Sequence, residues 1–177
     1  VCQIAKLKGC RAVGIAGGPK KCAHLLETMG FDGAIDYKNE TLSDGLKRTC
    51  PEGIDIFFDN IGGDILNTAL ARINVGARVV ICGAISQYNA TELTPGPSAY
   101  INLLGRRGKM QGFIYFDFRE QWPQMQKDLA KWREDGEINT EHDIAKGPVD
   151  IFPETLLRLF RGDNFGKLMI ELPTNLE

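Results

Sequence analysis

The sequence predicts an α/β fold, a doubly wound parallel sheet with helices on both faces. Short apolar runs alternate with amphipathic stretches along the 177 residues, and the runs are apolar throughout rather than alternately apolar and polar. Strands of that kind are buried on both faces, which is typical of parallel sheets covered by helices. Glycines follow several of the runs, as they do where a strand turns into the next helix.

The apolar runs and helical periodicities give the elements in chain order. The expected strands are 11–16, 34–37, 54–58, 77–82, 110–116, one after Gly136, and 167–172. The expected helices are 20–29, 42–50, 65–72, 121–134 and about 153–161. Residues 87–99 have no such pattern and form a long irregular loop, a feature that is usually functional inside a compact domain.

The first nine residues read as the last two turns of a helix that ends at Gly9. A doubly wound fold does not normally begin partway along a helix. We therefore expect further residues upstream of Val1, including a first strand and a glycine-rich turn that binds phosphate. The Gly-x-Gly-x-x-Gly spacing of such a turn is not met by Gly14, Gly17 and Gly18.

The charge balance and the cysteine positions argue against several classes of function. Twenty-one basic and 23 acidic residues give a net charge of -2, which is too balanced to indicate a nucleic acid or a membrane surface as partner. Five scattered cysteines and two histidines lack the short spacing of a metal site, so we expect no metal and reduced thiols in the cytoplasm. No apolar run approaches the ~20 residues of a membrane span.

The stretch Gly-Gly-Pro-Lys-Lys at 17–21 follows a predicted strand and opens a predicted helix. Lysines at a helix N-terminus oppose the helix dipole, unless an anion binds the backbone N–H groups there. Doubly wound NAD enzymes place Asp or Glu at this strand end, and no acid lies between Ala16 and Cys22. The stretch therefore favours NADP(H) over NAD, with Gly18 and Lys21 as candidate contacts. Two solvated lysines on an exposed turn are the alternative.

Two more predicted strands end in small or polar residues, and ligands of such sheets bind at the carboxyl ends of the strands. Residues 59–63 (Asp-Asn-Ile-Gly-Gly) close one strand. Asn60 can bond a ribose there, or the stretch can be a capped strand-to-helix turn. Residues 82–86 follow the next strand and are small enough for a ligand to approach the backbone closely. Cys82 is disfavoured as a nucleophile, because no histidine lies near it in the sequence.

Four stretches, in this order, form one pattern: residues 59–63, 82–89, 95–97 and 164–167. Together they resemble the zinc-independent medium-chain dehydrogenases/reductases of the prostaglandin reductase, alkenal double-bond reductase and curcumin reductase group. The resemblance covers nearly the whole chain, and several motifs in the right order make it specific. It implies a Rossmann-type NADP-binding domain at 1–138, without its first strand and glycine-rich turn, and a return segment to the catalytic domain at 139–177.

The resemblance also implies roles for the matching residues. Lys21 would bind the adenosine 2′-phosphate, Tyr37 would lie beside the adenosine, and Asn60 would meet a ribose. The nicotinamide side would be lined by Cys82, Gly83, Ala84, Ile85 and Ser86. The carboxamide would meet the backbone of Phe113, Ile114 and Tyr115. Asn164 would approach the nicotinamide from the return segment.

The reaction that the resemblance implies is NADPH-dependent reduction of the C=C bond of α,β-unsaturated ketones or aldehydes, without metal. At the position of Tyr88, this family donates a hydroxyl toward the substrate carbonyl oxygen. Hydride delivery to the far carbon builds negative charge on that oxygen, and a preorganised O–H donor stabilises the charge in the transition state. A packing anchor within its loop is the alternative role for Tyr88.

Two other functions fit the same residues. A quinone reductase of the same superfamily needs the same cofactor and a different pocket, whereas a nucleotide-binding module without turnover needs only the fold. A methyltransferase is disfavoured, because its cofactor carries no phosphate to meet Lys20 and Lys21. The sequence leaves the physiological substrate open.

The apolar run at 110–116 comes last in the sheet, so we expect it at an edge. An exposed apolar edge strand is an aggregation hazard unless it is paired or covered, and pairing across a two-fold axis predicts a homodimer. Covering by the chain's own loop is the alternative. We expect the chain by itself to bind NADP(H) weakly or not at all, because it lacks a central strand and a pyrophosphate-binding turn.

Overall fold

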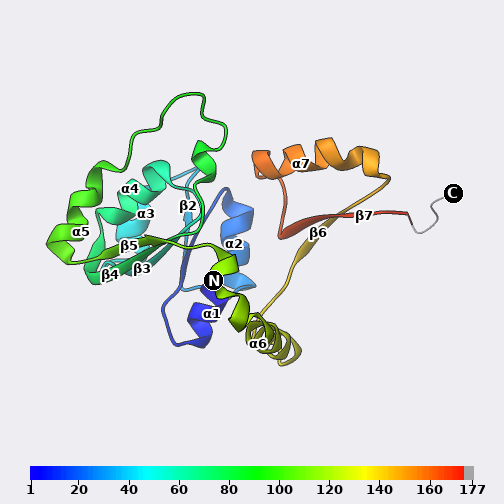
Figure 1. Cartoon of the computed structure of the whole chain (residues 1–177), viewed down its shortest axis with the longest axis horizontal. Coiled ribbons are helices and arrows are strands. Elements are labelled where there is room, and N and C mark those ends of the chain that lie inside the picture. Colours follow the sequence, from blue (N-terminus) through cyan, green and yellow to red (C-terminus); the bar gives the residue numbers. More distant parts are fainter. Residues whose placement is uncertain (174–177) are drawn as a thin grey trace. The chain divides into compact units, whose positions relative to one another are not determined.

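Parallel strands connected by helices make up the chain, and this confirms the α/β class (Figure 1). The structure is a computed structural model that describes residues 1–173. It divides into two compact units, Val1–Lys127 and a second unit that begins at Asp128 within helix α6 (Trp122–Glu134). Each unit is described by itself below.

The first unit holds five strands and five helices before α6. The strands are β1 (Val13–Ala16), β2 (Gly33–Asp36), β3 (Ile54–Asp59), β4 (Ile73–Ile81) and β5 (Lys109–Gly112). The helices are α1 (Cys2–Leu7), α2 (Pro19–Glu27), α3 (Leu42–Thr49), α4 (Gly63–Leu70) and α5 (Ile101–Arg106). Short 3₁₀ turns follow at η1 (Ile85–Gln87), η2 (Ser98–Tyr100) and η3 (Tyr115–Gln121).

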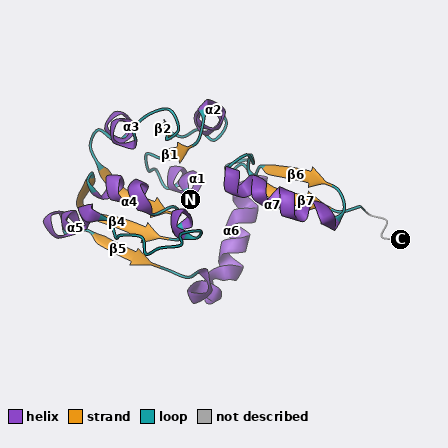
Figure 2. Ribbon diagram, turned by 90° about the horizontal axis from the view of Figure 1, so that it is seen from above, coloured by secondary structure: helices purple, strands orange, loops and turns teal. Residues whose placement is uncertain are grey.

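All strand pairs of this unit are parallel, as predicted, but they form two separate sheets. One sheet is β1–β2, with Val13 opposite Gly33, and the other is β3–β4–β5. Within residues 1–173 no ladder joins β1 to β3, so each of these strands has a partner on one side only. Figure 2 shows α2 and α3 on either side of the β1–β2 pair, and α4 over the other sheet.

Two apolar clusters hold the first unit together. One consists of Leu66, Leu70, Ile73, Ala77 and Val79, between α4 and β4. The other joins the two sheets, because it draws one residue each from β2, α3, β3 and α4: Ile35, Leu46, Ile54 and Ala69. Burial is less complete than the apolar pattern of β3 predicts, since the side chain of Ile56 is 49% exposed.

The structure differs from the prediction at β5 and α5, and β4 begins at Ile73 rather than at residue 77. The strand predicted at 110–116 is wrong after Gly112, because the N–H of Ile114 turns to Asp117 Oδ2 (3.4 Å) and the chain enters η3. Helix α5 was not predicted, since its six residues include a glycine and are too short to show a helical period. The helix end at Gly9 is confirmed by the left-handed φ of this residue (78°), which follows Lys8, the C-cap of α1.

The second unit is a strand–helix–strand arrangement that agrees with the predicted order. Strand β6 (His142–Lys146) pairs in parallel with β7 (Lys167–Glu171), and helix α7 (Phe152–Arg161) connects them after a short turn, η4 (Val149–Ile151). Gly162 ends α7 in the left-handed conformation (φ 68°), as a helix C-terminus favours. None of the helices in the described part of the chain has the length and apolar character needed to cross a bilayer.

Candidate functional site

The turn from β1 into α2 carries the Gly-Gly-Pro-Lys-Lys stretch. Gly18 is the N-cap of α2 with a φ of 94°, which favours glycine, and nothing lies within 4 Å of where its Cβ would stand. Lys20 is exposed and Lys21 half-buried in the first turn of the helix. A helix leaves the N–H groups of its first turn without intrahelical partners, so the expected anion-binding features come together here.

Asp36, at the end of β2, lies at the same turn, and the sequence does not predict it there. Its carboxylate accepts the N–H of Gly18 (2.8 Å), the N–H of Lys38 (3.1 Å) and a side-chain N–H of Asn39 (2.7 Å). The Asn39 side chain, followed by the Gly18 N–H, lowers the pKa of Asp36 below its ordinary value. No acid stands between Ala16 and Cys22 in the sequence, but the end of β2 places the carboxylate of Asp36 at the same turn.

Tyr37 and Lys38 reach the turn from the same strand end. A Cβ on Gly17 would stand 2.9 Å from the Tyr37 hydroxyl oxygen and 2.9 Å from Lys38 Cε, so both side chains cross over this glycine. Both are exposed. The structure therefore brings Tyr37 to the turn that carries Gly18 and Lys21, where the resemblance implies the adenosine end of the cofactor.

The turn after β3 is built around a buried carboxylate. Asp59 is 1% exposed, and its oxygens accept the N–H of Ile61 (2.9 Å) and of Gly62 (3.0 and 3.1 Å). Gly62 has a φ of 73°, and a Cβ there would stand 3.3 Å from the Cβ of Ala84. Asn60 is exposed at this strand end. The stretch is thus a turn capped by Asp59 that also presents Asn60 at the carboxyl edge of the sheet.

The turn after β4 is bonded directly to the turn after β3. The carbonyl of Asp59 accepts the N–H of Cys82 (2.8 Å) and the carbonyl of Asn60 accepts that of Ile85 (3.1 Å). The carbonyl of Ile61 accepts both the N–H (3.1 Å) and the hydroxyl (2.5 Å) of Ser86. Residues 82–86 and Asn60, all predicted site residues, therefore lie together.

Tyr88 lies over the same edge. A Cβ on Gly83 would stand 3.1 Å from the Tyr88 hydroxyl oxygen and 3.4 Å from the Asn60 carbonyl oxygen. Tyr88 is 66% exposed. A glycine at position 83 leaves the room in which this hydroxyl stands.

The predicted contacts at 113–115 follow β5. Phe113 extends the ladder by one bond to the Ile81 carbonyl (3.4 Å), and its ring packs on Phe58 with centroids 6.1 Å apart. Tyr115 stacks on Trp122 at 4.4 Å with an interplanar angle of 9°, and the Trp122 indole N–H donates to the Tyr115 carbonyl (3.4 Å). These contacts hold the backbone of the segment as it leaves the sheet.

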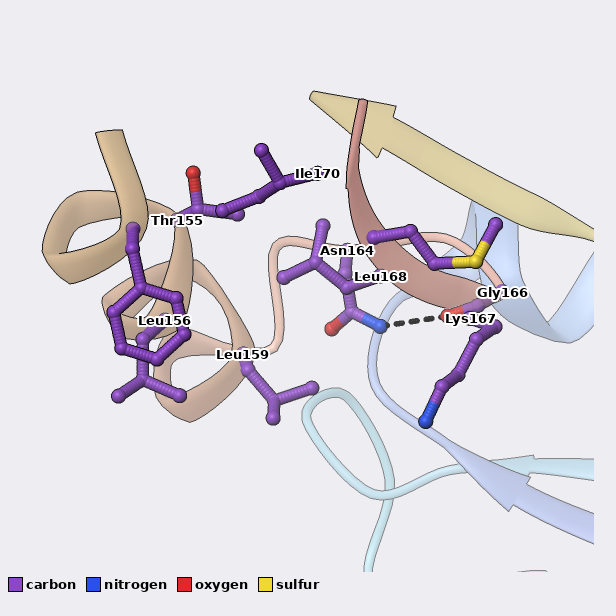
Figure 3. A pocket seen from close by; sticks show the side chains of 10 residues that line it. Thr155, Leu156, Leu159, Asn164, Gly166, Lys167, Leu168 and Ile170 are labelled. Atoms are coloured by element: carbon purple, nitrogen blue, oxygen red, sulfur yellow. Dashed lines mark hydrogen bonds between the residues drawn. The ribbon is translucent and has the colours of Figure 1, made fainter. Parts of the chain in front are cut away.

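Asn164 belongs to the second unit, where it lines a pocket between α7 and β7 (Figure 3). Its side-chain N–H donates to the Gly166 carbonyl (2.9 Å). The pocket has a volume of about 390 Å³, and most of its lining is apolar, including Leu156, Leu159 and Leu168. In the sequence, only the apolar face of the helix indicates this pocket.

The thiols and the metal-binding residue types do not gather into a site. Within residues 1–173, no group of three His, Cys, Asp or Glu side chains is placed to hold a metal ion, and all five cysteines are free. Burial raises the pKa of the Cys22 thiol, and the neighbouring Asp36 and Glu40 raise it further, which lowers its reactivity.

Parallel strands that end in glycine turns at one sheet edge are typical of α/β domains that bind a nucleotide. Residues 1–131 match the family described as zinc-binding dehydrogenase. The chain belongs to this family. The similar proteins confirm the prediction that it belongs to the group of the prostaglandin reductases and curcumin reductases.

Three similar proteins define that group. NADPH-dependent curcumin reductase of Escherichia coli (strain K12) is 39% identical over 175 residues, which are 96% of this chain and 50% of that protein. Prostaglandin reductase 1 of Bos taurus is 40% identical over 172 residues, 96% of this chain and 51% of that protein. The crystal structure of CurA with NADPH from Vibrio vulnificus has a TM-score of 0.91 at 39% identity, covering 99% of this chain and 53% of CurA. The chain thus spans about half the length of these relatives.

Proposed function

We propose that this chain supplies the NADPH-binding half of a reductase that saturates the C=C bond of α,β-unsaturated ketones or aldehydes without a metal ion. The observation that carries the proposal is the Tyr88 hydroxyl, which stands over Gly83 at the sheet edge where the turns after β3 and β4 meet. Relatives named as NADPH-dependent curcumin reductase and prostaglandin reductase support it. The full-length enzyme below means the protein that contains this chain.

The residues at the strand ends of the two sheets fit NADPH. The open space above Gly18 lets a phosphate approach the start of α2, where Lys21 supplies a cation. We assign Tyr37 to the adenosine and Asn60 to a ribose. We assign the remaining contacts to the nicotinamide: residues 82–86, 113–115 and Asn164. In this proposal residues 1–138 form the nucleotide-binding domain and 139–177 return to the catalytic domain.

NADPH, when bound, supplies the hydride that forms a C–H bond at the β-carbon of the substrate. The electrons of the C=C bond then move toward the carbonyl oxygen, and Tyr88 donates its O–H hydrogen bond to that oxygen. The bond strengthens as charge develops, so it lowers the barrier more than it improves substrate binding. A proton from solvent completes the saturated product at the α-carbon.

Tyr88→Phe in the full-length enzyme tests this role. Losing one oxyanion donor lowers kcat by about 10²–10³-fold, while KM for NADPH stays within a few-fold. The assay follows NADPH consumption with an enone, and a quinone is tested in parallel. Turnover of the quinone alone would support a quinone reductase instead, and NADPH binding without any turnover would support a non-catalytic module.

We further propose a homodimer that forms through β5 in the cytoplasm. All four residues of β5 are exposed, and within residues 1–173 the strand pairs with β4 only, so its second edge is open. The five free thiols agree with a reducing compartment. Sedimentation of the full-length enzyme measures the dimer directly, and a monomer at micromolar concentration contradicts it.

A further inference from the structure

The turn between β1 and α2 is surrounded by more cationic groups than the predicted contact Lys21. Lys20 precedes it on the helix, and Lys38 comes from the end of β2. The carboxylate of Asp36 connects the start of α2 with the segment after β2, since it accepts the N–H of Gly18 at 2.8 Å and that of Lys38 at 3.1 Å. The backbone position of Lys38 relative to the helix start is therefore fixed by hydrogen bonds.

The side chain of Lys38 is directed at the turn. Its Cε lies 2.9 Å from the position that a Cβ on Gly17 would take, beside the Tyr37 hydroxyl oxygen. Its ammonium group forms no ion pair with a carboxylate in the part of the chain that the structure describes. The nearby Glu40 is bound by Arg48 (2.7 Å). The charge of Lys38 is thus held at the glycine turn and is exposed to a ligand.

The net positive charge at the turn is close in magnitude to the negative charge of a phosphate monoester. Such a group carries about −1.5 to −2 at neutral pH. The carboxylate of Asp36 repels the phosphate. A single lysine would only cancel the charge of this carboxylate, so the net charge of the site would be close to zero. Lys20, Lys21 and Lys38 together exceed the charge of Asp36 by about two, which balances a phosphate monoester.

We propose that Lys38 is a second cationic contact for the 2′-phosphate of NADP(H), binding it from the β2 side of the turn while Lys21 binds it from the helix. The inference rests on the proposed function, and it adds a residue that determines the preference for NADPH. A Cβ on Gly17 would displace the ends of the lysine and tyrosine side chains that cross this glycine.

Calorimetric titration of the full-length enzyme tests the proposal with two ligands, adenosine 2′,5′-bisphosphate and adenosine 5′-monophosphate. We expect Lys38→Ala to weaken binding of the bisphosphate about tenfold, to leave the monophosphate unchanged, and to reduce the salt dependence of bisphosphate binding. Lys38→Arg keeps the charge and restores most of the affinity. Lys47→Ala is the matched control, because Lys47 is an exposed lysine on α3 that pairs with Asp44 (3.2 Å).

The outcomes separate this inference from the proposed function. If Lys21→Ala weakens bisphosphate binding and Lys38→Ala does not, or if Lys38→Ala weakens both ligands equally, the role of Lys38 is overturned and the NADPH site stands. If the wild-type enzyme does not prefer the bisphosphate, the NADPH site itself is overturned. Unchanged circular dichroism and thermal midpoint of each variant ensure that affinity is compared between folded proteins.

Discussion

Replacing Asp59 by alanine tests how the site is supported. The carboxylate is 1% exposed and accepts two backbone N–H groups, those of Ile61 and Gly62, over distances of 2.9–3.1 Å. Alanine leaves both donors without an acceptor. A buried donor that loses its partner costs about 1–3 kcal/mol, and the Ile61 group is only partly buried, so we expect Asp59→Ala to lower the free energy of unfolding by about 2–4 kcal/mol.

Asparagine gives the intermediate member of this series. Its amide oxygen can replace Oδ1, which accepts from both Ile61 and Gly62, but the second oxygen is replaced by a donor that faces the Gly62 N–H. We expect a loss of about 1 kcal/mol, because the two remaining bonds also lose the strengthening that a charged acceptor provides.

Urea unfolding followed by circular dichroism measures the series, with Glu52→Ala as an exposed control in the turn before β3. The control should change stability by less than about 0.5 kcal/mol. If Asp59→Ala falls within that range, or if Asp59→Asn is the more damaging change, the carboxylate does not support the turn in the way that its hydrogen bonds indicate.

Three further predictions concern the cofactor and the second unit. Lys21→Ala in the full-length enzyme should cost NADPH binding about 1.5–3 kcal/mol; an unchanged ratio of the KM values for NADPH and NADH would rule out its assignment. The 177-residue chain alone should bind NADP(H) only weakly in a calorimetric titration, because within residues 1–173 no ladder joins the two sheets whose strand ends form the proposed site; micromolar or tighter binding would contradict this. In the second unit, the Phe165 N–H, followed by Arg158, lowers the pKa of Asp143, so this carboxylate stabilises the fold above its ordinary pKa and the contribution disappears as the pH falls through the lowered value. Asp143→Asn should therefore lower the thermal midpoint near neutral pH and flatten its decline in acid; an identical acid profile would refute the linkage.

The order of strands and helices could be predicted because each depends on neighbouring residues. Apolar runs mark β1 to β4, and Gly9 and Gly162 mark helix ends through their left-handed backbone. The end of β5 could not be read in this way. Residues Phe113 to Phe116 are as apolar as a strand, but one side chain three residues after Ile114, that of Asp117, accepts its N–H and stops the ladder.

Much of the candidate site was also predictable, because the ends of parallel strands meet at one edge. Asn60, the 82–86 stretch and Tyr88 follow two adjacent strands, and they lie together in the structure. Asp36 was not predictable. It is 18 residues away from Gly18 in the sequence, and only the pairing of β1 with β2 brings its carboxylate to the N–H at the helix start.

The position of the Tyr88 hydroxyl depends on the buried carboxylate of Asp59. Asp59 fixes the turn after β3, and the carbonyls of that turn accept the N–H groups of Cys82, Ile85 and Ser86, which precede Tyr88. A change at Asp59 should therefore displace the hydroxyl from its position over Gly83 and lower kcat, in addition to weakening the fold. A change at Lys21 or Lys38, which lie beside the β1–β2 sheet, should weaken NADPH binding and leave kcat at saturating NADPH unchanged.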